Sequence, residues 1–169
     1  MSLLVAPDPG WPGQAQVWAE EWRKVCGTGL IQVHHMGSTS VPGLPAKPII
    51  DLMPVFTDTE AMMAAQVAVE AMGYEWMGAY GLPGRGYARR DDPATGKRVV
   101  QAHCYPQGHA DIARHLAFRD ALRANAPLRA AYTMEKARCA ARHPEGGADY
   151  GRCKSAWIDR AESEALSRD

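Results

Sequence analysis

The spacing of apolar residues along the chain predicts a domain that mixes helices and strands. Apolar side chains recur every three or four positions over residues 14–26, where Trp18 and Trp22 share one face of a predicted helix. Prolines and glycines interrupt residues 6–13, which we therefore expect to be non-helical. The amphipathic stretches beyond residue 110 predict a C-terminal part made of helices.

The strongest strand signal is the apolar run at 49–56, which carries a single charge, Asp51. Pro54 lacks an amide N–H, so we expect it at a sheet edge or strand exit. The other predicted elements are strands at 31–35 and 74–77, a helix at 59–72 capped near Asp58, a hairpin of 87–90 with 98–105, and helices at 111–124, 128–142 and 149–166, the last capped by Asp149. Together they predict one α/β (α+β) domain over residues 1–169, with a mixed sheet, flanking helices and a helical C-terminal part.

Composition removes several classes of function. The 169 residues contain 19 basic and 19 acidic side chains, so no net positive field indicates a nucleic-acid partner. The sequence has no apolar run of membrane-spanning length and no signal-peptide pattern, so we expect no membrane partner and a cytoplasmic location. The charge is divided unevenly, because residues 1–84 carry 3 basic and 8 acidic side chains while residues 85–169 carry 16 and 11. The basic half could hold an anionic ligand, or the two halves could simply attract each other.

The four cysteines show no spacing typical of a zinc ribbon or a thioredoxin-like site. They are Cys26, Cys104, Cys139 and Cys153. In a reducing compartment we expect four free thiols, mostly packed in the interior.

The segment over residues 34–56 carries the candidate chemistry. It places a Gly-Ser turn after one strand and Asp51 inside the next. Glycine allows close backbone approach, and the hydroxyls of Ser38, Thr39 and Ser40 could donate to phosphate oxygens. A carboxylate fixed beside such a turn could bind Mg²⁺ together with those phosphates.

This segment closely resembles the signature of the GrpB-like family, HIGSTSVPGLxAKPIID. The resemblance continues in DPGWP (8–12), GLPGRGYARRD (81–91), HLAFRDALR (115–123) and the pair Tyr150 and Lys154, so it covers almost the whole chain. It implies a nucleotidyltransferase-like fold, in which carboxylates bind two metal ions that position a nucleoside triphosphate. Related domains are also fused to dephospho-CoA kinases, which suggests a link to coenzyme A.

The chain departs from the superfamily pattern at the metal ligands. Met53 occupies the position, two residues after Asp51, where a second carboxylate is expected. The later strand offers His103 in place of a third carboxylate, and Gln101 replaces the first histidine of the family's HLH motif. An Asp51 and His103 pair could hold one divalent ion, Mg²⁺ or Mn²⁺, so two-metal catalysis is in doubt.

Each candidate residue has a functional and a structural interpretation. We expect His35 either to contact ligand or to brace the turn, and Asp51 either to bind metal and act in catalysis or to form a buried ion pair. The candidates for phosphate or nucleotide binding are Gly37, Ser38, Thr39, Ser40, Lys47, Arg85, Arg119, Tyr150 and Lys154. Arg119 and Lys154 could instead brace neighbouring helices.

The leading functional hypothesis is nucleotidyl transfer to a small molecule, with a phosphate-bearing ligand such as a nucleotide as the partner. The alternative is a non-catalytic nucleotide- or coenzyme A-binding module with a degenerate metal site. A metal-dependent hydrolase that uses His103 has weaker support, because no histidine pair has ligand spacing. The sequence does not indicate an oligomeric state.

Overall fold

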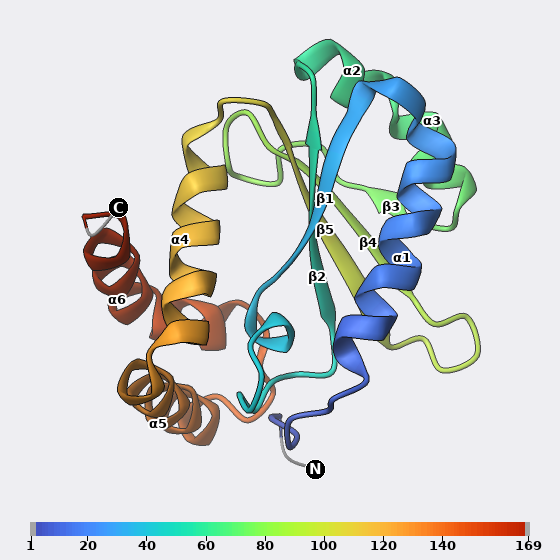
Figure 1. The fold of residues 1–169 in the computed structure, drawn as a ribbon. Coiled ribbons are helices and arrows are strands. Elements are labelled where there is room, and N and C mark those ends of the chain that lie inside the picture. The colour runs from blue at the N-terminus through green and yellow to red at the C-terminus, as the bar shows by residue number, and fades with distance from the viewer. Residues whose placement is uncertain (1–2, 168–169) are drawn as a thin grey trace.

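A five-stranded mixed sheet forms the centre of the computed structural model, which describes residues 3–167 of the predicted domain. The strand order is β1-β2-β5-β4-β3, and only β2 and β5 run parallel (Figure 1). The strands are β1 (Leu30–Met36), β2 (Ile50–Phe56), β3 (Glu75–Trp76), β4 (Gly86–Asp91) and β5 (Arg98–Pro106). The sheet therefore confirms the predicted α/β class and the predicted hairpin of β4 with β5.

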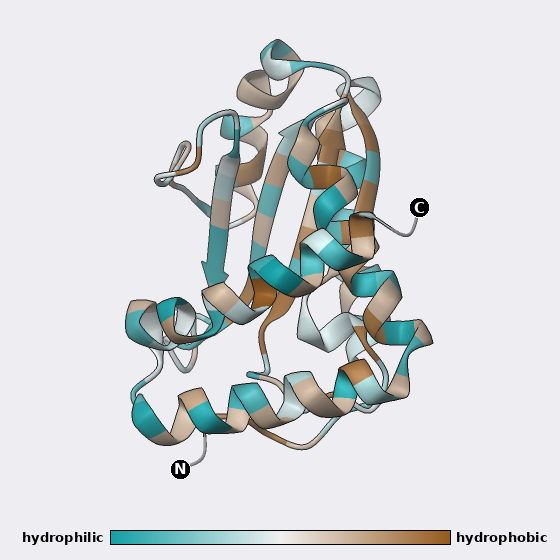
Figure 2. Ribbon diagram, turned by 90° about the vertical axis from the view of Figure 1, so that its left-hand side faces the viewer, coloured by the Kyte–Doolittle hydropathy of each residue, from teal (hydrophilic) through white to brown (hydrophobic). Residues whose placement is uncertain are grey.

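Helices cover both faces of the sheet. On one face lie α1 (Trp11–Cys26), α2 (Thr59–Ala64) and α3 (Gln66–Ala71), and on the other α4 (Ala110–Ala124), while α5 (Ala126–Arg142) and α6 (Gly147–Leu166) pack against α4 (Figure 1). Short 3₁₀ turns follow α1 at Gly27–Gly29 and follow β1 at Ser38–Ser40. Figure 2 shows the helices banded with hydrophilic and hydrophobic segments, as expected for helices that each cover a core with one face. No helix within residues 3–167 is long and apolar enough to cross a membrane.

Strand β2 is buried on both faces of the sheet. Its side chains alternate between the two faces, which decides on which side Asp51 lies. Ile50, Leu52 and Phe56 face α1 and belong to the large core. Asp51 and Met53 point to the opposite face. Met53 is fully buried there in a small apolar cluster that α4 covers.

Four local predictions need correction. Helix α1 begins at Trp11, because Pro12 occupies the first turn, where a missing N–H costs nothing. Pro54 lies inside a central strand, where the pairing of β2 with β5 forms on either side of it. The predicted helix at 59–72 is divided at Ala65 into α2 and α3, although Asp58 caps α2 as expected. Asp149 lies within the first turn of α6, whose N-cap is Gly146.

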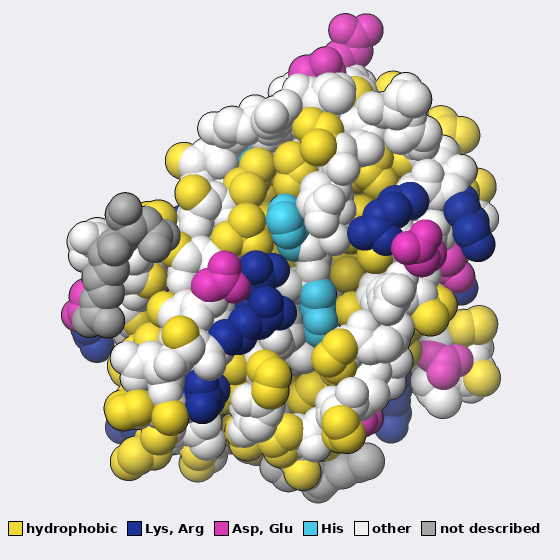
Figure 3. All heavy atoms as spheres, viewed as in Figure 1, with side chains coloured by type: hydrophobic (Ala, Val, Ile, Leu, Met, Phe, Trp, Pro, Cys, Tyr) yellow, Lys and Arg dark blue, Asp and Glu magenta, His cyan; other side chains and the backbone are white. Residues whose placement is uncertain are grey.

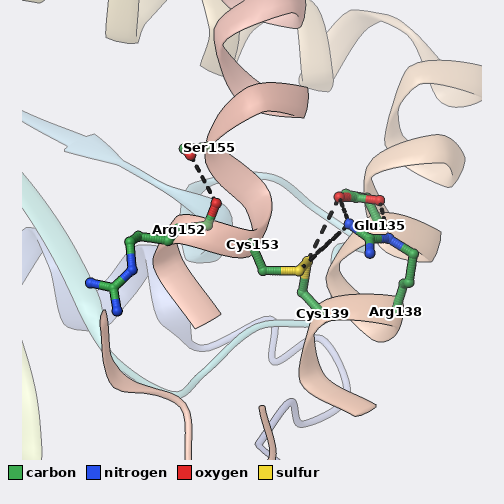
Figure 4. Close-up of a disulfide and its surroundings, with 6 residues drawn as sticks. All are labelled: Glu135, Arg138, Cys139, Arg152, Cys153 and Ser155. Carbon is green, nitrogen blue, oxygen red and sulfur yellow. Dashed lines mark hydrogen bonds and ion pairs between the residues drawn. A yellow bond between two sulfur atoms is a disulfide. The ribbon is translucent and has the colours of Figure 1, made fainter. Parts of the chain in front are cut away.

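The prediction of four free thiols is wrong for two of them. Cys139 of α5 and Cys153 of α6 form a disulfide, with Cα atoms 5.7 Å apart (Figure 4). Residue spacing could not reveal this pair, because it is created by the packing of α5 against α6. Cys26 and Cys104 are free thiols, as predicted.

Candidate functional site

The Gly-Ser turn, residues 37–40, lies directly against Asp51. Gly37 has φ +72°, and a Cβ atom there would lie 2.5 Å from Asp51 Oδ2. Both the positive φ and this close approach require glycine. The turn thus packs closely against the carboxylate of Asp51 in β2.

Two of the three hydroxyls in the turn already have hydrogen-bond partners in the turn or in β1. Ser40 Oγ donates to Gly37 O at 2.6 Å, and Thr39 Oγ1 hydrogen-bonds with His35 Nε2 at 2.9 Å. His35 therefore braces the turn, and burial lowers the pKa of its ring to about 4, so the imidazole is neutral. Ser38 is half-buried and lines the cavity that Asp51 also lines.

Asp51 has polar partners from neighbouring strand β5. The register places Gln101 beside it, and Gln101 Nε2 donates to Asp51 Oδ1 at 2.7 Å. Tyr87 of β4 donates its hydroxyl to Gln101 Oε1 at 2.7 Å, which fixes the orientation of that amide. His103 Nε2 lies 3.3 Å from the same Asp51 oxygen, so the structure brings the predicted metal pair together.

A cavity of about 560 Å³, here called the main cavity, opens in front of Asp51. Its volume lies within the range usual for small-molecule sites. Among the described residues that line it, Asp51 is the one acidic side chain. The polar and aromatic lining residues are Ser38, Thr39, Lys47, Asp51, Tyr80, Tyr87, Arg89, Arg98, Gln101, Lys136, Tyr150 and Lys154.

Lysines dominate the side of the main cavity opposite the sheet. Lys154 Nζ lies 4.3 Å and Lys47 Nζ 4.7 Å from the ring centroid of Tyr150. Burial and the nearby Lys47 charge lower the pKa of Lys154 to about 8. Burial raises the pKa of Tyr150 to about 12, so its hydroxyl stays protonated. The predicted residues Lys47, Tyr150 and Lys154 therefore meet at one place.

Lys136 of α5 is a lining residue that the sequence analysis missed. It is only 2% exposed, donates from Nζ to Pro45 O, and lies with Nζ 5.3 Å from the centre of the Tyr132 ring. Burial and the charge of Lys154 lower the pKa of Lys136 to about 7. A sequence signal existed, because Lys136 shares its helix face with Tyr132 and Cys139, both buried.

Two predicted arginines have structural roles in this arrangement. Arg85 Nη2 donates to the carbonyl oxygens of Ala79 and Tyr80, while Nη1 lies 3.4 Å from His103 Nδ1. It holds the 78–86 loop to β5 and does not line the main cavity.

Arg119 of α4 braces the motif from the other side. Its Nη1 donates to His35 O at 3.1 Å, and its Nε donates to Asp120 Oδ1 at 2.8 Å. Figure 3 shows basic side chains gathered where α4 meets the centre of this face. Arg119 nevertheless lines a smaller cavity of about 220 Å³, which it shares with Ser38, Asp51 and Lys154. The structure thus places Arg119 near the site with its guanidinium already bonded.

Comparison with known proteins gives the same assignment along almost the whole chain. The family model described as GrpB protein matches residues 3–164. The protein YqkA of Bacillus subtilis is 38% identical over 146 residues, which are 86% of this chain and 42% of that protein. This chain therefore spans less than half the length of that relative.

Solved structures extend the comparison to the fold. The crystal structure of GrpB from Enterococcus faecalis is 37% identical, covers 98% of both chains and has a TM-score of 0.89. Cid1 in complex with the UTP analogue UMPNPP aligns with a TM-score of 0.53 at 13% identity, over 89% of this chain and 48% of that one. At that identity the likeness to Cid1 shows the nucleotidyltransferase fold alone. The chain belongs to the GrpB family and has a nucleotidyltransferase-like fold.

Proposed function

We propose that this protein binds a nucleotide through its phosphate groups in the main cavity. The observation that carries the proposal is the convergence of Lys47, Lys136 and Lys154 on a cavity that also contains Ser38 and a single carboxylate, Asp51. Ammonium groups and a hydroxyl are suitable donors for phosphate oxygens. The nucleotide complex of Cid1 supports the same ligand class through shared fold.

The aromatic side of the main cavity fits a nucleobase. Tyr80 and Tyr87 stack with ring centroids 5.1 Å apart and planes 14° from parallel. Such a pair offers a flat face on which a base could stack, a contact worth about 1–3 kcal/mol. Tyr80 is 57% exposed, so one face of the pair remains open to a ligand.

A two-metal centre, which the fold family implies, does not fit these residues. Asp51 Oδ1 already accepts a hydrogen bond from Gln101, and Met53 is fully buried in the apolar cluster under α4. Mg²⁺ and Mn²⁺ prefer several oxygen ligands, whereas Asp51 and His103 supply one carboxylate and one imidazole.

Nucleotidyl transfer to a small molecule is a second candidate. It is favoured by the contact between Asp51 and the Gly-Ser turn, which reproduces the strand–turn–strand layout of the nucleotidyltransferase motif. In this proposal Ser38 and the lysines hold the phosphates, while Asp51 orients the reacting group.

A thermal-shift titration with ATP, GTP, CTP, UTP and coenzyme A tests the binding proposal. A ligand at 100 times its Kd adds about 2.7 kcal/mol to the unfolding free energy and raises Tm. Lys154→Gln should weaken binding by about 10- to 150-fold, because one charge-assisted hydrogen bond is worth roughly 1.5–3 kcal/mol. Lys97→Gln, at an exposed lysine outside the main cavity, is the matched control.

A pyrophosphate-release assay with the same nucleoside triphosphates separates binding from transfer. Pyrophosphate release from a bound triphosphate would establish transfer, while saturable binding without release would leave a binding module. If none of the five ligands raises Tm, the nucleotide proposal is wrong.

A further inference from the structure

The charge distribution of the main cavity is unusual for a site that holds phosphates through metal ions. Metal-dependent sites gather carboxylates, because each divalent ion needs negative ligands. Here Asp51 is the one carboxylate among the described lining residues, and its Oδ1 already contacts Gln101 and His103. The available charge in this cavity is positive.

The positive charge comes from lysines without acidic partners. Within residues 3–167, Lys47, Lys136 and Lys154 form no ion pair, and their ammonium groups lie against tyrosine rings or a backbone carbonyl. The cavity arginines differ, because Arg89 is paired with Glu75 and Arg98 with Asp91. Three lysines that share a single carboxylate, Asp51, leave an excess of positive charge, and an anion in the cavity would relieve their mutual repulsion.

We propose that the main cavity binds the di- or triphosphate group of its nucleotide without a divalent cation, with the ammonium groups of Lys47, Lys136 and Lys154 neutralising the phosphate charge. This inference rests on the proposed function. In physical terms, the three lysines replace the metal ions. The ligand class is therefore the free polyphosphate anion and not its magnesium complex.

Proton uptake on binding is a second consequence of neutralising phosphate with buried lysines. Burial and the charge of a neighbouring lysine lower the pKa of Lys136 to about 7 and that of Lys154 to about 8. The neighbour is Lys154 for Lys136 and Lys47 for Lys154. The groups that face them in the main cavity are Lys47 from the loop before β2, Asp51 from β2, Tyr132 from α5 and Tyr150 from α6. In the smaller cavity Lys154 is also joined by His115 and Arg119 of α4 and by Glu162 of α6.

A bound phosphate group would raise both lysine pKa values. At pH 7.5 these two lysines together lack about one proton in the free protein, and binding should restore it.

Isothermal titration calorimetry of the full chain with inorganic pyrophosphate tests the proposal. One titration is run in EDTA and one in excess Mg²⁺, each in two buffers of different ionisation enthalpy. We expect saturable binding in EDTA that Mg²⁺ weakens or leaves unchanged. Wild type should take up about 0.8 proton more than Lys136→Met at pH 7.5, a difference in which protons on the ligand cancel.

Variants assign the effect to the lysines. Lys154→Met should weaken binding in EDTA by about 10- to 150-fold, while the exposed control Lys97→Met should leave it unchanged. Binding only in the presence of Mg²⁺ would overturn the metal-free proposal and leave the nucleotide proposal standing. Absence of pyrophosphate binding in both conditions, with nucleotides still raising Tm, would also overturn it. No binding of either ligand would overturn both proposals.

Discussion

Lys136 should destabilise the folded protein at neutral pH. Lys136→Met should therefore raise the free energy of unfolding at that pH. The side chain is 2% exposed, and its pKa falls from 10.5 to about 7 on folding. The unfolded chain therefore holds this proton up to about pH 10.5, while the folded chain releases it near pH 7. Wild-type stability should consequently rise with pH across that window.

The magnitude follows from the two pKa values. At pH 7 the shift corresponds to about 4 kcal/mol of lost stability. Methionine removes that cost but leaves Pro45 O without its donor, a penalty of about 1–3 kcal/mol. The net gain for Lys136→Met should thus be about 1–3 kcal/mol at pH 7. By about pH 10 the electrostatic cost is below about 1 kcal/mol, so the variant should lose its advantage.

Urea unfolding at pH 6, 7, 8, 9 and 10 measures this difference directly, with Lys97→Met as the exposed control. The same Lys136→Met protein should bind pyrophosphate measurably but more weakly than wild type, which would show stability given up for function. A Lys136→Met protein that is less stable than wild type at pH 7, by an amount that does not vary with pH, would contradict this expectation. Lys136 would then act as a brace for the carbonyl of Pro45.

Three further predictions concern the turn, the disulfide and a buried histidine. Gly37→Ala should lower the free energy of unfolding by about 1–3 kcal/mol, because φ is +72° and the new Cβ would meet Asp51. A denaturation curve like that of wild type would show that the turn does not require glycine at this position. Replacing Cys139 and Cys153 by serine should lower the free energy of unfolding by about 3 kcal/mol, as expected for a disulfide that closes a loop of about 15 residues. In urea unfolding, dithiothreitol should destabilise wild type by the same amount and leave the double variant unchanged. Burial lowers the pKa of His115 to about 4, so the free energy of unfolding should fall by about 3 kcal/mol between pH 6.5 and pH 4. In acid unfolding experiments, His115→Gln should make the free energy of unfolding depend less on pH over this range.

Local patterns were sufficient to predict most of the elements. Strands β1 and β2 lie within one residue of the predicted bounds, and the hairpin of β4 and β5 forms as expected around its turn. The contact between Gly37 and Asp51 followed from the motif, because a turn that joins antiparallel neighbours keeps its residues close to both strands. Hydrophobic periodicity and turn-forming residues act over a few positions, so a single sequence is enough to recognise them.

Non-local pairing was beyond such reasoning. The partnership of Asp51 with Gln101 depends on β5 lying parallel beside β2, 50 residues along the chain. The sequence indicated Gln101 as a departure from the family pattern but could not show that its amide donates to the carboxylate. The bonds of Arg85 and Arg119 to backbone carbonyl groups were hidden for a related reason, because such bonds carry no sequence signature.

The lysine cluster shows which kind of non-local feature a sequence does encode. Lys136 follows Tyr132 by one turn and precedes Cys139 by three residues, so a cation lies on the apolar face of its helix. A buried cation is costly unless something compensates it, and no acidic residue occupies a neighbouring turn on that face. Such a position predicts either a partner from another element or a bound anion. Here the structure supplies a backbone carbonyl, two more lysines and one carboxylate, Asp51, so positive charge remains in excess. The bound anion that we propose would compensate that excess.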